Sequence, residues 1–250
     1  MKLAPPVYLV GSGSQGINLT DPCDCHVYLV DGVTELALVD AGAGMDVDGI
    51  LEQIRNDGFD PTQVTHLILT HAHADHAGGA AALREALGHP RVYLHADIAD
   101  CLRNGDEGPA SVVQGKQGGI YPDGYQYNPC PVDVELTDGQ IIKIGQLILE
   151  AVDTPGHSRG HMCFMMAHDE RTWFFGGDLL FFGGKILLQD IWDCDLRAYL
   201  KSIKGLRNAG IDVFLPGHQS FSLCDGQRHV DSALKIIDQL LVPPNLSYGW

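Results

Sequence analysis

Three histidines and an aspartate lie within six positions, from His71 to His76, directly after an apolar run. The run, residues 65–70, reads THLILT and is typical of a short buried strand. Residues 77–87 then predict a helix whose first turn is rich in glycine. His71 and His73 are two residues apart, so both side chains can point the same way in extended chain. Asp75 and His76 begin the helix and face the same space, so any fold of this chain must gather these side chains at one strand end.

The residue types in this cluster are those of a metal site. Neutral imidazole binds zinc, iron and other divalent first-row metals, and a carboxylate adds the negative charge that a dication requires. A lone histidine is more often a solvated or buried side chain without a metal. Three histidines and an aspartate at this spacing reverse that expectation, and the sequence predicts a metal centre here.

Three later segments place a further ligand-capable residue after an apolar strand. Residues 147–152 lead into TPGHS with His157, residues 173–175 into GGD with Asp178, and residues 213–215 into PGH with His218. In each case a proline or glycine ends the strand, which is the geometry that turns a side chain toward a common rim. We therefore expect these three residues to join the cluster.

Taken together, these motifs resemble the metallo-β-lactamase-fold hydrolase superfamily, and in particular its glyoxalase II and lactonase-like branch. The similar elements are THxHxDHxGG at residues 70–79, TPGHS, GGD and PGH, in the order of the family, with VDAG at residues 39–42 similar to its VDxG element. The resemblance runs from about residue 7 to about residue 237, nearly the whole chain.

The resemblance implies a dinuclear centre with two divalent cations per chain, zinc first and iron or manganese as alternatives. Its ligands would be His71, His73 and His157 for one cation, Asp75, His76 and His218 for the other, and Asp178 as a bridge. Asp40 would orient a ligand through a hydrogen bond, and His161 would support the site without binding metal. A metal-bridging hydroxide would attack the substrate, with Asp75 and Asp178 as the catalytic carboxylates.

The order of expected elements is that of a mixed α/β chain. The family likeness implies an αββα sandwich, in which two mixed sheets pack face to face between outer helices, as one domain over residues 1–250. We expect helices near 46–57, 77–87, 195–208 and 226–241, a first sheet from strands near 7–10, 26–31, 35–40, 65–70 and 91–94, and a second from strands near 134–136, 141–144, 147–153, 161–167 and 172–176, closed by 212–215.

Two segments are expected to shape the substrate site. The first is an insertion near 103–131, rich in glycine and proline, which we predict to fold over the site as a lid. The alternative is a surface excursion. The second follows Asp178 and is either pocket lining or core. The candidate pocket residues are Tyr28, Tyr121, Tyr125, Phe181 and Phe182.

The composition limits the kinds of partner that we expect this protein to bind. The net charge of −16 and the lack of Lys or Arg runs argue against nucleic acid, and no apolar stretch reaches the roughly 20 residues that span a bilayer. The N-terminal residues lack the apolar core of a signal peptide, so we expect a cytoplasmic protein with mostly reduced cysteines, a small-molecule substrate and a homodimeric assembly. Cys23 and Cys25 are either loop residues near the site or a redox element.

The chain departs from particular branches of this superfamily, and these departures limit the reactions that we expect it to catalyse. Family β-lactamases usually lack the bridging aspartate, whereas Asp178 is present. Only 32 residues follow His218, too few for the helical substrate domain of glyoxalase II. Many lactonases carry a tyrosine three residues after the bridging aspartate, where this chain has Phe181. We predict a hydrolase of a lactone or thioester, with a non-haem iron persulfide dioxygenase or a β-lactamase-like amidohydrolase as alternatives.

Overall fold

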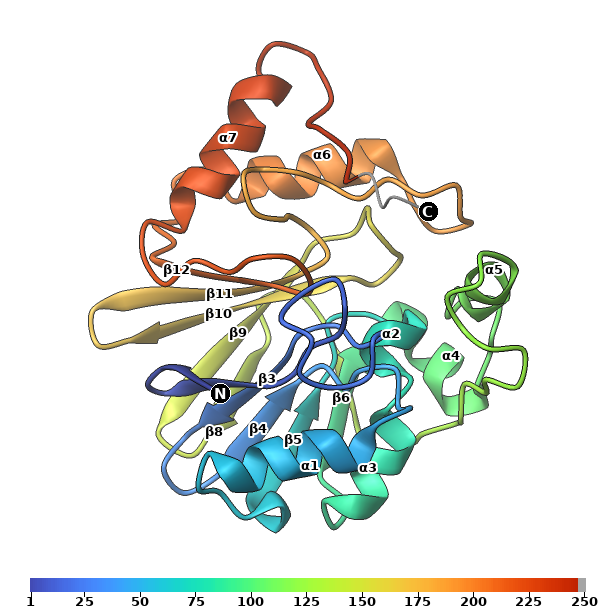
Figure 1. The fold of residues 1–250 in the computed structure, drawn as a ribbon. Coiled ribbons are helices and arrows are strands. Elements are labelled where there is room, and N and C mark those ends of the chain that lie inside the picture. The colour runs from blue at the N-terminus through green and yellow to red at the C-terminus, as the bar shows by residue number, and fades with distance from the viewer. Residues whose placement is uncertain (247–250) are drawn as a thin grey trace.

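Two β-sheets packed face to face form the centre of the computed structural model, which describes residues 1–246 (Figure 1). The first sheet contains, in spatial order, β1 (Lys2–Ala4), β2 (Val7–Gly11), β3 (Val27–Asp31), β4 (Leu36–Val39), β5 (Val64–Ile68), β6 (Arg91–His95) and β7 (Val134–Leu136). The second contains β12 (Val213–Pro216), β11 (Arg171–Gly177), β10 (Met162–His168), β9 (Leu147–Asp153) and β8 (Ile141–Ile144).

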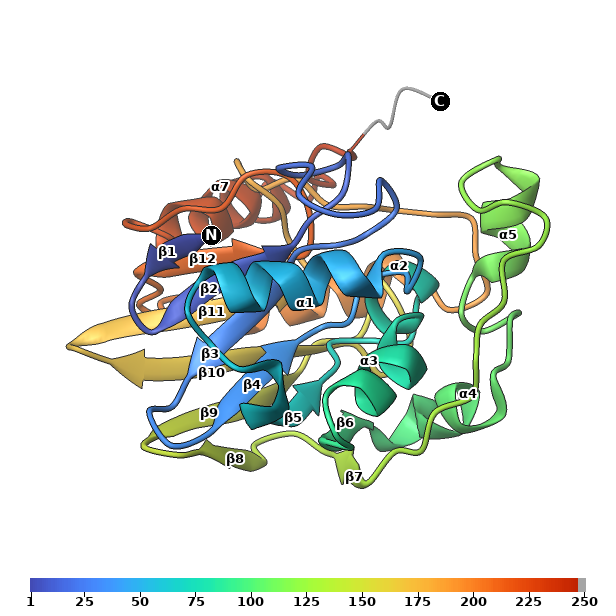
Figure 2. The same ribbon diagram turned by 60° about the horizontal axis from the view of Figure 1, so that its bottom comes forward.

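Helices cover the outer faces of both sheets (Figures 1 and 2). On the side of the first sheet lie α1 (Val47–Asn56), α2 (Ala74–Ala77), α3 (Ala80–Ala86), α4 (Ala99–Asn104) and α5 (Val112–Gln117). On the side of the second sheet lie α6 (Leu196–Gly205) and α7 (Gln227–Ile237). Two 3-10 turns, at Pro61–Gln63 and Ala96–Ile98, belong to the connections of the first sheet. The predicted four-layer αββα sandwich is thus confirmed. No helix within the described part of the chain is both long and apolar enough to cross a bilayer.

Burial on both faces explains why the central strands read as continuous apolar runs. In β2, Val7 and Leu9 pack into the core between the two sheets, whereas Tyr8 and Val10 pack against the helical layer. Successive side chains of a strand point to opposite faces, and here both faces are covered. The two inner faces meet in one apolar layer, to which Trp173 of β11 contributes the largest side chain.

One strand belongs to a different sheet from the one predicted. Residues 134–136 form β7, which pairs in parallel with β6 at the edge of the first sheet, with Tyr93 opposite Val134. The prediction of a second-sheet strand was wrong because a long crossover, residues 96–133, returns the chain beside β6 in the same direction. Helices α4 and α5 lie in this crossover and were not predicted, since six residues each show too little periodicity. β1 was not predicted either.

The strands that precede the predicted ligands end at one rim of the sandwich. β4 and β5 run parallel in the first sheet, and β11 and β12 run parallel in the second. β9 runs in the direction of β11, because both are antiparallel to the intervening β10. The loops after these five strands therefore converge where the two sheets meet.

Candidate metal centre

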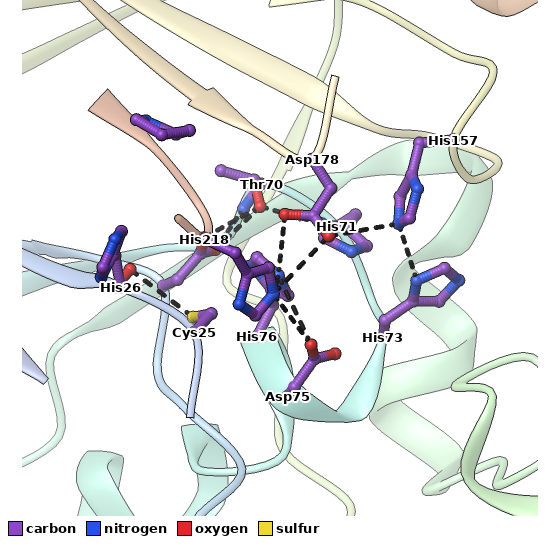
Figure 3. Close-up of polar contacts among 12 residues, drawn as sticks. Cys25, His26, Thr70, His71, His73, Asp75, His76, His157, Asp178 and His218 are labelled. Atoms are coloured by element: carbon purple, nitrogen blue, oxygen red, sulfur yellow. Dashed lines mark hydrogen bonds and ion pairs between the residues drawn. The ribbon is translucent and has the colours of Figure 1, made fainter. Parts of the chain in front are cut away.

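The loops after β5, β9, β11 and β12 bring seven side chains together (Figure 3). Possible ligand atoms lie within 4.8 Å of one another in each of two groups. The first group is His71, His73 and His157, and the second is Asp75, His76 and His218.

Asp178 lies between these two groups. Its Oδ2 is 3.6 Å from His157 Nε2 on one side and 3.6 Å from His218 Nε2 on the other, and its Oδ1 is 3.3 Å from His76 Nε2. The carboxylate is thus within reach of both groups, as a shared ligand of two cations would be.

Local backbone geometry accounts for the placement of the β5 cluster. His73 is extended, with φ −60° and ψ 146°, and stands at the N-cap of α2. Side chains two apart in the extended stretch point to one side, and the helix then turns Asp75 and His76 toward the same space. The change from extended to helical backbone within four residues is what gathers four side chains.

Gly217 permits the close approach of the last ligand loop. A Cβ atom at this position would lie 2.3 Å from Asp178 Oδ1 and 2.6 Å from His76 Cε1. No L side chain fits there without displacing one of them. The glycine of the PGH motif is therefore part of the geometry of the centre.

Asp40 lies behind His76, on the side away from the cluster. Its Oδ2 accepts a hydrogen bond from His76 Nδ1 at 2.8 Å, and its Oδ1 accepts one from the Thr70 backbone N–H at 2.7 Å. A proton on Nδ1 leaves the Nε2 lone pair of His76 facing Asp178 and His218, which is the tautomer that a metal ligand needs.

His161 acts on the backbone of Asp178. Its Nε2 accepts a hydrogen bond from the Asp178 N–H at 3.0 Å, and its Nδ1 contacts Thr154 Oγ1 at 2.9 Å. Since Nε2 is occupied in this way, His161 supports the site and is not placed as a ligand.

Two further supporting residues escaped the sequence analysis. Asp193 is buried with its Oδ2 3.5 Å from His73 Nε2, and the Tyr199 hydroxyl donates to the Asp178 carbonyl at 2.6 Å. Asp193 is one of three aspartates in residues 190–195, and no local signal separates it from the other two. In the sequence, nothing distinguishes Tyr199 from the other apolar positions of the helix predicted near 195–208. Both contacts arise from packing between segments distant in sequence.

The donor set fits divalent cations. His73 Nδ1 lies 3.1 Å from His157 Nε2, and His76 Nε2 lies 3.2 Å from His218 Nε2. His76 donates through Nδ1 to Asp40, so its Nε2 faces another ring nitrogen as a lone pair. Among residues 1–246, the buried His71 Nε2 and Asp178 Oδ1 have no hydrogen-bond partner. Lone pairs and orphaned acceptors aimed at one space are what a cation there would satisfy.

The protonation of the site agrees with this fit. Burial, and then the neighbouring imidazoles, lower the pKa of His71 well below its ordinary value. Burial likewise lowers the pKa of His157 to about 4, so this ring is neutral at pH 7, as a ligand must be. Burial also opposes a charge on His76, yet the Cys25 thiol and three carboxylates together raise its pKa well above the ordinary value. The surroundings of His76 thus favour a positive charge, which a bound cation would supply in place of a proton on Nε2.

A cavity of about 560 Å³ opens above the centre and is lined by His73, Asp75, His157, Asp178 and His218. Three segments form its other walls: the loop after β2 at 14–24, residues 110–121 around α5, and residues 187–191 before α6. The insertion near 103–131 therefore does contribute to the cavity wall. Whether it opens and closes as a lid stays a prediction.

Of the predicted pocket residues, only Tyr121 lines this cavity, and Tyr125 stacks behind it. Tyr28 is buried between the sheets, with its hydroxyl donated to the Pro216 carbonyl at 2.7 Å. Phe181 is buried against Leu187, and Phe182 is 41% exposed. None of these three lines the cavity: Tyr28 faces the sheet interior, Phe182 packs on His229, and the Phe181 ring lies 6.4 Å from that of His218. Their role toward a substrate stays a prediction.

Cys23 and Cys25 belong to the loop that forms one wall. Cys23 lines the cavity and donates to the Ile120 carbonyl, whereas Cys25 is fully buried beneath the centre. Burial, and then Asp21, raise the pKa of the Cys23 thiol to about 12, so it is protonated at neutral pH. Such a thiol is a poor nucleophile.

An αββα sandwich with a histidine and aspartate centre at the rim between its sheets defines the class of metallo-β-lactamase-fold enzymes. The chain belongs to the metallo-beta-lactamase superfamily, whose family model matches residues 20–218. Its histidine and aspartate groups indicate binding of divalent metal, as predicted.

Curated relatives include thioesterases. The chain is 26% identical over 195 residues to an atrochrysone carboxyl ACP thioesterase of Aspergillus fumigatus, a match that covers 77% of this chain and 50% of that protein. It is 29% identical over 185 residues to an uncharacterized protein of Aquifex aeolicus, covering 72% and 76%. The chain thus spans about half the length of the fungal relative.

Solved structures with the same fold include β-lactamases. A metallo-β-lactamase with a HARLDQ motif from Cronobacter sakazakii superposes with a TM-score of 0.71 at 22% identity, covering 96% of each chain. The MIM-2 metallo-β-lactamase gives a TM-score of 0.67 at 22% identity, covering 89% of this chain and 84% of that one. At this level of identity the likeness establishes the fold and leaves the substrate open.

Proposed function

We propose that this protein is a dinuclear metal-dependent hydrolase of a small, uncharged ester-like acyl substrate, a thioester or a lactone. The observation that carries the proposal is the position of Asp178, whose two oxygens reach both ligand groups at the floor of one cavity. The names of fungal relatives favour the thioester.

His71, His73 and His157 would hold one cation, Asp75, His76 and His218 the other, and Asp178 would join them. Two divalent cations, zinc first, supply a water of lowered pKa and polarise a carbonyl when bound. Asp40 and Asp193 keep two of the imidazoles in orientation from behind. Asp75 lines the cavity with a partly exposed carboxylate, and it would pass a proton to the leaving group.

The charge of the cavity supports an uncharged substrate. Asp24, Asp75 and Asp178 line it, and none of its described lining residues is Lys or Arg. A substrate carboxylate or phosphate would therefore find no cationic side chain to pair with, and only the bound cations themselves would offer it positive charge. Penicillins carry a carboxylate, and we accordingly expect poor β-lactam hydrolysis although the fold is shared with β-lactamases.

The first test measures metal content by elemental analysis together with turnover on three neutral probes: S-butyryl-N-acetylcysteamine, p-nitrophenyl butyrate and δ-decalactone. Asp178→Ala should lose metal and at least about 100-fold in kcat/KM, or about 2.7 kcal/mol. Asp100→Ala, at a carboxylate 84% exposed, is the matched control and should retain both.

Two results would overturn the proposal. Full activity and full metal in Asp178→Ala would remove the shared carboxylate from the reaction. One iron per chain with oxygen uptake on a persulfide would replace hydrolysis by the dioxygenase reaction. A comparison of S-butyryl with S-succinyl-N-acetylcysteamine tests the charge argument, since equal kcat/KM for both would contradict it.

A further inference from the structure

Among residues 1–246, five tyrosines lie around the metal centre, and four of them use their hydroxyl within the protein. In each of these four the hydroxyl donates to a backbone carbonyl oxygen, at 2.6 to 3.0 Å. The pairs are Tyr28 with Pro216, Tyr125 with Ala43, Tyr127 with Ala72 and Tyr199 with Asp178. Tyr121 differs from all of them. It lines the cavity, and no hydrogen bond joins its hydroxyl to any residue of the described chain 1–246.

The ring of Tyr121 is held on both sides. It stacks on Tyr125 with ring centroids 4.6 Å apart and planes 17° apart. On another side it packs directly on the backbone of Gly115, where a Cβ atom would lie 2.4 Å from Tyr121 Cδ2. Tyr125 is in turn fixed by its bond to Ala43. The Tyr121 hydroxyl is therefore presented to the cavity at little further cost in side-chain entropy.

The electrostatic surroundings keep this hydroxyl a donor. Burial, and then the Asp75 carboxylate, raise the pKa of the Tyr121 phenol well above its ordinary value. The proton stays on the oxygen throughout the neutral range, and a donor without a partner inside the protein is available to a ligand. Asp75, His157, Asp178 and His218 line the same cavity, so such a ligand would lie against both the phenol and the metal centre.

We propose that the Tyr121 hydroxyl donates a hydrogen bond to the acyl oxygen of the substrate, and that Tyr121 is thereby a catalytic residue of the reaction proposed above. The bond strengthens as this oxygen gains negative charge during attack on the carbonyl. Three residues after Asp178, Phe181 is buried and offers no hydroxyl for this purpose. The donor comes instead from the segment after α5, in the cavity wall formed by residues 110–121.

The variant Tyr121→Phe tests this with the ring and its stacking retained. On S-butyryl-N-acetylcysteamine we expect kcat to fall about 10- to 100-fold with KM changed less than about threefold. This loss of kcat is smaller than in an enzyme whose oxyanion hole is the sole stabiliser of the acyl oxygen. Metal content and melting temperature should match the wild type. Tyr8→Phe, in a tyrosine packed on Phe59 far from the cavity, is the control and should keep the wild-type kcat.

An unchanged kcat in Tyr121→Phe would overturn the proposal, as would loss of metal, which would make the residue structural. The inference rests on the proposed hydrolase, so a second measurement separates the two. The neutral trifluoromethyl ketone analogue of the butyryl thioester, titrated calorimetrically into zinc-loaded protein, should bind Tyr121→Phe at least about fivefold more weakly than wild type. If no acyl probe is hydrolysed, the proposed function fails, and equal ketone affinities would then overturn the role of Tyr121 independently.

Discussion

Gly217 has Asp178 and His76 as its nearest neighbours, and the space around it is smaller than a methyl group. Gly217→Ala places a Cβ atom only 2.3 Å from Asp178 Oδ1 and 2.6 Å from His76 Cε1, so the Asp178 carboxylate or the His76 ring must move. We expect the variant to lose at least half of its bound metal, because a shift of a few tenths of an ångström spoils a ligand geometry. Elemental analysis of purified protein measures this.

Gly205→Ala is the matched control for this change. Gly205 ends α6, needs no left-handed backbone, and has no atom within 4 Å of the place where a Cβ atom would lie. Alanine there should leave metal content unchanged and stabilise the helix by a few tenths of a kcal/mol. Wild-type metal binding in Gly217→Ala would show that the loop after β12 relaxes without cost.

Individual site residues were predictable where the chemistry is concentrated in a short motif. Three histidines and an aspartate in six positions admit few explanations, whereas Asp193 and Tyr199 are ordinary residues until the loop before α6 and the helix itself are packed. The position of Tyr28 between the sheets could have been predicted from the period of its strand. Its neighbour Val27 faces the helical layer, so Tyr28 must face the other sheet.

The loop between β2 and β3 is held to the rest of the site by a buried carboxylate. Asp24 accepts hydrogen bonds from the Ala43 N–H at 2.7 Å and from Thr20 Oγ1 at 2.6 Å. It thereby joins the cavity wall at residues 14–24 to the turn after β4. Burial raises the pKa of Asp24 to about 6, from an ordinary 3.8.

This pKa predicts a pH dependence of folding stability. The folded protein holds a proton on Asp24 that the unfolded chain releases above about pH 4, so the native state binds more protons between the two pKa values. The stability contributed by the protonated group is complete below about pH 4 and is lost as the pH rises through about 6. The loss is on the order of 3 kcal/mol at most.

Asp24→Asn removes the ionisation and keeps the shape. The free energy of unfolding of wild type minus that of the variant should decrease from pH 4 to pH 7, as measured by urea unfolding at several pH values with equal metal supplement. A difference that stays flat or increases with pH would contradict a raised pKa at this carboxyl group.

Among secondary-structure elements, length decided what could be predicted. Strands such as residues 147–153 and helices such as α1 and α7 carry enough period to be read directly, and all were found within a few residues. The six-residue helices α4 and α5 do not. The sheet to which β7 belongs depends on where a crossover of nearly 40 residues returns, which no local pattern encodes.

The molecule as a whole carries a net charge of −16, and the metal centre is its most concentrated group of buried donors. The αββα layering was expected from the resemblance to a known family, because the pattern of elements alone indicates only a mixed α/β chain. The acidic surface is consistent with an uncharged substrate, since an anion would be repelled at long range. The expected homodimer stays a prediction, which light scattering would check.

Removal of metal should destabilise the entire fold. Cations that bind only the folded state stabilise it by about 2.7 kcal/mol per site at one hundred times Kd, which for a chain of this size corresponds to about 5–10 °C. Dialysis against a chelator should therefore lower the melting temperature in differential scanning calorimetry by at least about 5 °C, and zinc should restore it. Equal melting temperatures with and without metal would show that the groups are not ligands.

The two ligand groups draw on both sheets, and this has a consequence for how the chain acquires its metal during synthesis. His71, His73, Asp75 and His76 leave the ribosome early, yet the first group is complete only with His157 and the second only with His218. If both groups bind cations as proposed, the two positions would be completed in a fixed order as translation proceeds. A nascent chain stalled before β12 would contain every residue of the first group but would lack His218 of the second, so the second cation would enter last.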